Sequence, residues 1–370
     1  MQRLTRLDGV RGLLAVYVMI GHGEPFIAWP SWWQPVHHFF SHGLAAVDLF
    51  FALSGLVIAQ SLSRFPRVGL FLQARARRLL PVYLLVMAGA VLIIALGSPL
   101  PFMPWLAGHQ AASMLWATSM PRPLTLHLLA HLTLTHGLIP DGALPFAYVT
   151  LLGPAWSLST EWQFYVAAAL VVACLGDARR HLPQLAWVLI VLALMGEIYD
   201  LAASPYWRFS RAFLPNQAGY FALGVASARL LVDRNQAARR HYLLILLLVL
   251  LLAAARLQAD KILPPLLWTL LLASEYAPDA PILRPLGQIL NSRLAQRLGA
   301  ISYPLYLVNE PIQRLMALLI CRLVAPGPAA FALLWAPASI AATFLVASLL
   351  HRHVEFRFLR RRPQGAVVTI

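Results

Sequence analysis

Two residues of the first apolar stretch, Arg11 and His22, are of types that rarely enter a membrane without a role. They are eleven positions apart, and at about 100° per residue this amounts to three turns plus roughly 20°. Both side chains are therefore expected on one helix face, about 16 Å apart along the axis. Arginine suits phosphate and histidine is the usual base near neutral pH. The spacing indicates a polar path; the alternative is that Arg11 is an orientation anchor and His22 only ends the helix.

The composition identifies a membrane protein with several spans. The chain has 370 residues, of which 60% are hydrophobic and 12% are charged, against about 25% charged in soluble domains. The net charge of +15 does not indicate nucleic-acid binding, because the arginines lie in short segments between apolar stretches. The two cysteines, Cys174 and Cys321, lie within apolar stretches and indicate neither a disulfide framework nor a metal site.

Ten apolar stretches are expected as transmembrane helices of an all-α bundle, and the two shorter ones, 242–255 and 263–273, as a hairpin. They cover 7–25, 43–62, 79–96, 155–175, 184–202, 213–232, 242–255, 263–273, 299–319 and 329–350. The intervening arginines orient the bundle with both termini in the cytoplasm. Those expected inside include Arg64, Arg67, Arg179, Arg180, Arg239, Arg240, Arg284, Arg293, Arg361 and Arg362.

The segment 97–154 is rich in proline, histidine and glycine, and must cross the membrane an even number of times if the flanking orientation holds. We expect no crossing, with short re-entrant or interfacial helices within a single domain of 1–370; two short crossings would give twelve spans instead. His127, His131 and His136 are spaced by four and five residues. Their spacing allows a metal site, but no acidic or thiol ligand joins them, and a wet interfacial helix explains them as well.

Six blocks of the sequence, taken in order, resemble the membrane-bound acyltransferase-3 family. They are LDGVRGLLAVYVMIGH at 7–22, AAVDLFFALSGLVI at 45–58, RARRLLP at 75–81, WSLSTEWQFY at 156–165, LGAISYPLYLVNEPI at 298–312 and HRHVEFRF at 351–358. The family hallmark is an arginine and a histidine with ten residues between them, which Arg11 and His22 match. One departure is Asn309, which stands where many members have histidine.

The resemblance implies an O-acyltransferase of the bacterial inner membrane. Such proteins pass an acetyl group from cytoplasmic acetyl-CoA to a hydroxyl of a carbohydrate or glycolipid across the bilayer. On this basis Arg11, Arg75 and Arg78 are expected to bind the phosphates of coenzyme A, since guanidinium forks match phosphate. No metal is expected.

His22 is the candidate base, because a hydroxyl that attacks a thioester must lose its proton. A carboxylate that orients the imidazole would complete the pair, and the sequence offers Asp48 and Glu161 without choosing between them. Other readings stay open. Asp48 could form a structural ion pair with Arg11, and Ser157 or Ser159 could carry an acyl group, although no Gly-x-Ser-x-Gly elbow surrounds them.

The rival function is a transporter or flippase for a lipid-linked sugar, which would also have a polar bundle interior. A base beside a phosphate-binding mouth is the discriminating feature, because transport requires no activation of a thioester. Arg314, within a late apolar stretch, could face a cavity or a lipid headgroup in either protein.

Overall fold

The computed structural model describes residues 4–62, 65, 67–116, 119–176, 180–255 and 259–360. The orientation signals Arg64, Arg179, Arg361 and Arg362 lie outside these residues. All regular elements in the described part of the chain are helical. The all-α prediction is confirmed for these residues.

Every expected span has a helix at its position. These helices are α1 (Thr5–Gly23), α3 (Gly43–Leu62), α4 (Val68–Ala95), α7 (Ala155–Leu175), α8 (Leu182–Ala202), α9 (Ala218–Asp233), α10 (Gln236–Ala255), α11 (Ala259–Tyr276), α13 (Arg293–Val324) and α14 (Pro328–Leu350). The shorter α-helices are α2 (Gln34–Phe40), α5 (Gln110–Leu115), α6 (Leu124–Leu132), α12 (Arg284–Asn291) and α15 (Phe356–Arg360). A π-helical turn, His351–Glu355, joins α14 to α15.

Length and composition qualify 6 helical ranges of the described residues as candidate membrane spans. They are Ser31–Leu62, Val68–Ala95, Ala155–Leu175, Leu182–Ala202, Gln236–Ala255 and Pro328–Phe358. The chain is thus a multi-pass helical membrane protein, while the count of ten spans and the sides of the termini stay predictions. The helices α1 and α13 are absent from the six, and both carry the polar residues that concern the candidate site.

Two helices begin earlier than the apolar pattern indicates. The basic block with Arg75 and Arg78 lies inside α4, which continues through Pro81, rather than in a preceding loop. Arginine is a good helix former, and proline is tolerated in membrane helices whose neighbours satisfy the freed backbone groups. Likewise α13 begins at Arg293, so Arg297 is helical. Arg75, Arg78 and Arg297 therefore lie on helices and not in loops; Arg75 and Arg78 are half-buried and Arg297 is exposed.

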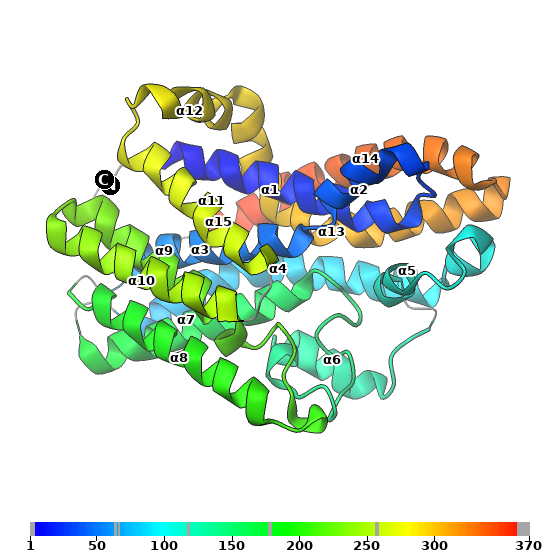
Figure 1. Cartoon of the computed structure of the whole chain (residues 1–370). Helices are drawn as coiled ribbons and strands as arrows, with labels where there is room; N and C mark the ends of the chain where they lie inside the picture. Colours follow the sequence, from blue (N-terminus) through cyan, green and yellow to red (C-terminus); the bar gives the residue numbers. More distant parts are fainter. Residues whose placement is uncertain are drawn as a thin grey trace.

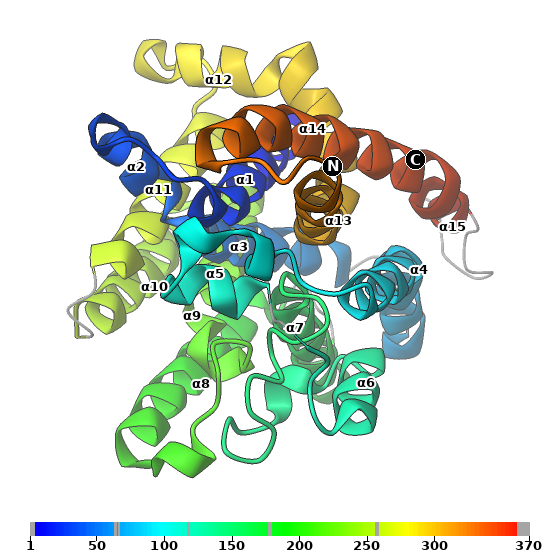
Figure 2. The same ribbon diagram turned by 90° about the vertical axis from the view of Figure 1, so that its right-hand side faces the viewer.

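The helix α3 lies at the centre of the bundle. It contacts α1, α7, α9 and α11, and Figure 2 shows these helices arranged around it. Figure 1 shows α1, α13 and α14 running side by side along one flank, while α2, α5 and α6 gather toward the right-hand end. The amphipathic α12 packs on α1 toward the left-hand end. The segments expected outside the membrane, α2 and 97–154, thus meet at one end.

Small residues bring the helices that carry the site into close contact. A Cβ atom placed on Gly12 of α1 would lie 2.4 Å from the backbone nitrogen of Gly299 in α13. A Cβ on Gly55 of α3 would lie 2.4 Å from the carbonyl oxygen of Phe221 in α9. Small residues allow such close backbone approach between membrane helices. The α1–α13 contact holds His22 against Asn309, as the next subsection describes.

Candidate active site

A cavity with three guanidinium groups lies between α1, α3, α4, α7 and α13, and we call it the arginine cavity. Its empty volume is about 750 Å³. Arg11, Arg75, Arg78 and Glu161 all line it, so four of the six predicted site residues converge here from three helices. Its remaining polar lining is Ser54, Ser157, Tyr165, Ser302, Tyr303 and Tyr306. Three cations against one carboxylate suit a ligand with several phosphates.

Two of the three arginines of this cavity have hydrogen-bond or ion-pair partners in the described chain, and the third has none. Arg11 forms an ion pair with Asp8 at 3.4 Å, and Arg75 Nη2 donates to Ser61 Oγ at 3.1 Å. Arg78, in contrast, has no hydrogen bond or ion pair with any residue of the described chain. Its guanidinium group lines the cavity with its donors available, which is the arrangement that a phosphate requires.

Glu161 lies in the arginine cavity rather than beside His22. Its Oε1 atom accepts hydrogen bonds from Ser54 Oγ and Tyr165 Oη, each at 2.5 Å. Such contacts fix the carboxylate between α3 and α7. The structure therefore gives Glu161 a place near the phosphate-binding arginines and no hydrogen bond to the candidate base.

Asp48 lies elsewhere again. Its buried carboxylate pairs with Lys261 of α11, with Oδ2 and Nζ 3.2 Å apart. The alternative of an ion pair between Asp48 and Arg11 is wrong, because Arg11 pairs with Asp8. Asp48 therefore connects α3 to α11 and has no hydrogen bond with His22.

The partner of His22 is Asn309, the residue that stands where many family members have a histidine. His22 Nδ1 lies 2.8 Å from Asn309 Oδ1. The Asn309 amide nitrogen donates to the carbonyl oxygens of Leu305 and Tyr306, at 3.3 and 2.7 Å, which fixes the orientation of the amide. Because Oδ1 can only accept, Nδ1 must carry the proton, and the lone pair of the neutral imidazole is on Nε2. His22 is thus oriented as a base.

A second cavity lies one helical turn further along α13, and we call it the Glu310 cavity. Its empty volume is about 1330 Å³, and its lining includes Arg122, His127, Phe146, Thr150, Glu310 and Arg314. On α13, Ser302 and Tyr306 line the arginine cavity, and Glu310 and Arg314 line the Glu310 cavity. Residues four apart share a helix face, so one stripe of α13 serves both cavities. Asn309, the partner of His22, lies between the two pairs along α13, and neither His22 nor Asn309 belongs to the lining of either cavity.

Hydrogen bonds between α7 and α13 form the boundary between the two cavities. The hydroxyl groups of Ser157 and Tyr306 are 2.9 Å apart, and Tyr306 Oη also donates to Pro154 O at 3.3 Å. One turn away, the Gly153 N–H donates to Glu310 Oε2 at 2.9 Å. No hydrogen bond joins Ser157 to His22, since both Ser157 contacts in the described chain are accounted for by Tyr306 and Pro154.

The three histidines of the segment 97–154 are buried and have separate partners. His127 Nδ1 lies 2.8 Å from Thr150 Oγ1, His131 Nδ1 donates to His127 O at 2.9 Å, and His136 Nε2 donates to Ala155 O at 3.1 Å. The rings of His131 and His136 stack with centroids 4.2 Å apart. Burial lowers the pKa of His131 to about 3 and the pKa of His136 to about 4. No group of three potential ligands in the described chain could hold a metal ion.

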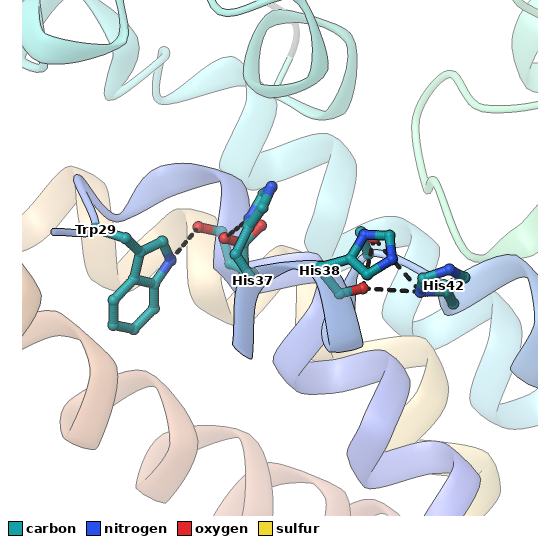
Figure 3. Close-up of polar contacts among 6 residues, drawn as sticks. Trp29, His37, His38 and His42 are labelled. Atoms are coloured by element: carbon teal, nitrogen blue, oxygen red, sulfur yellow. Dashed lines mark hydrogen bonds and ion pairs between the residues drawn. The ribbon is translucent and has the colours of Figure 1, made fainter. Parts of the chain in front are cut away.

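Just beyond His22, the chain leaves α1 through a polar cluster (Figure 3). The Glu24 carboxylate is buried and pairs with the His37 ring of α2, while Trp29 Nε1 donates to Glu24 O at 3.2 Å. His42 Nδ1 donates to His38 O at 2.8 Å, and its Nε2 lies 3.2 Å from Asp260 Oδ1. These contacts hold α2 against the end of α1, and so fix the end of the helix that carries His22.

Comparisons with known proteins identify the family of the chain. The model of a family described as an acyltransferase domain matches residues 4–352. The chain is also 30% identical over 219 residues to a protein from Rhizobium radiobacter called "Protein 2 in picA locus", an alignment that covers 55% of this chain and 97% of that protein. No solved structure matches the chain.

Proposed function

Because this chain belongs to the acyltransferase-3 family, we propose that it transfers an acetyl group from cytoplasmic acetyl-CoA to a hydroxyl of a carbohydrate or glycolipid at the bacterial inner membrane. The observation that carries the proposal is the hydrogen-bonded pair that His22 of α1 forms with Asn309 of α13. Asn309 lies between Tyr306, which lines the arginine cavity, and Glu310, which lines the Glu310 cavity. In this proposal the donor and the acceptor would each extend beyond the lining of its cavity to reach His22.

The arginine cavity would receive the donor. Arg11, Arg75 and Arg78 would bind its phosphates, with Arg78 contributing an unpaired fork. The pantetheine arm would then extend along α1 toward His22, over the distance of about 16 Å that separates positions 11 and 22 on a helix. Glu161, held by Ser54 and Tyr165, would allow the three arginines to remain close together, because its negative charge offsets their mutual repulsion.

His22 would act as general base and then as general acid. Nε2 takes the proton of the acceptor hydroxyl as its oxygen attacks the thioester carbonyl carbon. The tetrahedral intermediate then collapses, the carbon–sulfur bond breaks, and the same proton passes to the leaving sulfur. The products are the acetyl ester and the free thiol, with no net gain or loss of protons. Asn309 accepts from Nδ1–H throughout and keeps the ring in one tautomer.

We propose direct transfer rather than an acyl-serine intermediate. Ser157 is the serine nearest to the boundary, but its hydroxyl contacts Tyr306 and Pro154 and not a histidine. A serine nucleophile requires an adjacent base within hydrogen-bond reach. The hydrogen bonds of Ser157 instead suit a structural role between α7 and α13.

The test is acetyl transfer by the purified protein in detergent with radiolabelled acetyl-CoA and an extract of bacterial envelope glycans. The wild type should release thiol and form labelled ester in equal amounts. His22→Gln, which retains polarity but cannot accept a proton in this way, should be slower by about 10²–10⁴-fold, the usual contribution of a general base. Unchanged turnover in His22→Gln would exclude the residue as the base. Movement of a lipid-linked sugar without ester formation would favour a transporter.

A further inference from the structure

The Glu310 cavity differs from a simple apolar cleft in its paired charges. Arg122 reaches it from the segment before α6, and Glu310 and Arg314 reach it from α13. The space in it that a ligand can occupy is about 530 Å³, within the roughly 300–1,000 Å³ of common small-molecule sites. It is therefore large enough for a sugar-sized ligand.

Arg122 is the first indication of what that ligand carries. Its side chain is exposed, and its guanidinium group has no hydrogen bond or ion pair with the residues that the structure describes. Under the expected topology the segment 97–154 faces away from the cytoplasm, where the positive-inside rule disfavours arginine. Neither orientation nor packing explains Arg122. A guanidinium fork with free donors at the rim of a cavity matches an oxyanion.

Glu310 provides the complementary group deeper in the cavity. Its Oε2 atom is held by the Gly153 N–H, whereas Oε1 has no hydrogen-bond partner in the described chain and keeps some accessible surface. An ionised carboxylate can only accept hydrogen bonds, so Oε1 suits a hydroxyl donor. Glu310 directly follows Asn309, the partner of His22, along α13.

The wall of the cavity supplies a second, independent observation. Phe146 and Leu151 both line it, and both have left-handed backbone conformations, with φ of 57° and 63°. Bulky residues rarely adopt such angles, and strained residues cluster at ligand sites. Phe146, which is 57% exposed, adds aromatic surface to a lining that is mainly apolar and carries a few charged groups. Aromatic surface beside a few polar groups is typical of small-molecule sites.

We infer that the Glu310 cavity is the acceptor site and that it binds a sugar bearing an oxyanion, with Glu310 at a hydroxyl and Arg122 at the anion. The inference rests on the proposed function, because it assigns the acceptor of the same reaction. A phosphate on a free sugar and a phosphate linking a sugar to a lipid present the same oxyanion to Arg122, so the experiment compares both.

The experiment measures binding without an acyl donor. Glucose, glucose 1-phosphate and a polyprenyl-phosphate-linked glucose are titrated by calorimetry into the purified full-length protein in nanodiscs. Wild type should bind the phosphorylated compounds about ten- to a hundredfold more tightly than glucose, the factor expected of hydrogen bonds to a charged group. Arg122→Gln should abolish this difference, and Arg122→Lys should keep part of it. Tighter binding of the lipid-linked compound than of glucose 1-phosphate would identify a lipid as the source.

Arg208→Gln is the matched control. Arg208 is also an exposed arginine, and its backbone carbonyl oxygen accepts a hydrogen bond from the Asp141 N–H. It does not line the Glu310 cavity. It should leave the preference for phosphate intact. Equal affinity for glucose and its phosphorylated forms, or an unchanged preference in Arg122→Gln, would overturn the inference. If either of these results were obtained but the wild type still formed ester in the acetyl-CoA assay, the inference would fail and the proposed function would remain supported.

Discussion

Ser157 of α7 and Tyr306 of α13 join their hydroxyl groups at 2.9 Å, at the level where the lining of α13 passes from the arginine cavity to the Glu310 cavity. Both residues line the arginine cavity, and the Gly153–Glu310 hydrogen bond lies one turn further along α13. The two cavities thus have a common boundary built from side chains of two helices. In the proposed reaction this boundary would keep donor and acceptor apart except at His22.

Asn309→Leu should lower kcat by about 10- to 100-fold, on the scale of losing one hydrogen bond that orients a catalytic group. Leucine has a similar volume but cannot accept from His22 Nδ1, so the ring would lose its preferred tautomer. The KM for acetyl-CoA should not change, because Asn309 does not line the arginine cavity. Steady-state kinetics separate the two parameters. A kcat equal to that of the wild type would mean that the hydrogen bond is only structural.

Arg78→Ala should weaken coenzyme A binding by about 1.5–3 kcal/mol, the scale of a hydrogen bond to a charged group. Arg78→Lys keeps the charge but loses the planar fork, so it should still weaken binding. Calorimetric titration of coenzyme A and of dephospho-coenzyme A measures both effects. The control is Arg77→Ala, one residue earlier in α4 and outside the cavity lining. Equal losses in the two alanine variants would point to a general charge effect instead of a specific contact.

Gly12→Ala should destabilise the protein by about 1–3 kcal/mol, as expected for overpacking. The new Cβ would lie 2.4 Å from the Gly299 nitrogen, so α1 and α13 would have to separate. The separation would move His22 away from Asn309 and slow acyl transfer as well. Gly89→Ala is the matched control, because Gly89 is also helical and has nothing within 4 Å of its Cβ position. Thermal unfolding should leave Gly89→Ala near wild type; equal melting temperatures for the two variants would contradict the packing argument.

The stability of the segment 97–154 should fall as the pH falls below about 6.5, the ordinary pKa of histidine. Burial lowers the pKa of His131 to about 3 and of His136 to about 4, so between those values and 6.5 the unfolded chain binds more protons than the folded chain. The free energy of unfolding therefore decreases toward acid, by up to about 1.4 kcal/mol per pH unit for each histidine. Thermal unfolding at pH 7.5, 6 and 5 measures this slope. A His131→Gln/His136→Gln variant should flatten it, and an unchanged slope would assign the effect to other groups.

The apolar pattern predicted most of the architecture. A helix occurs at each of the ten expected positions, because long apolar stretches have few alternatives to a helix in a bilayer. Charged helix ends were harder to predict. The pattern placed Arg75 and Arg78 in a loop, yet they lie in α4, since hydropathy marks where a helix enters lipid and not where it begins.

The candidate site could be predicted only in part. Arg11, Arg75 and Arg78, which were expected to act together, do line one cavity, whereas Glu161, a candidate partner of His22, lies in that cavity as well. The partner of His22 could not be derived, because Asn309 is 287 positions away along the chain and the contact depends on how α1 packs on α13. The Glu310 cavity was missed for the same reason, although Glu310 and Arg314 carried a detectable signal, as two charges four residues apart in an apolar stretch.

The shared stripe of Ser302, Tyr306, Glu310 and Arg314 makes the site sensitive to register. Inserting one residue into α13 between Tyr306 and Glu310 would rotate the second half of the stripe by about 100° relative to the first, and Glu310 would no longer face its cavity. Inserting four residues would nearly restore the rotation but move the second pair about 6 Å along the axis, beyond the reach of the Gly153 N–H. A change in the length of α13 between these residues would therefore separate the two halves of the site even if every side chain of the stripe were kept.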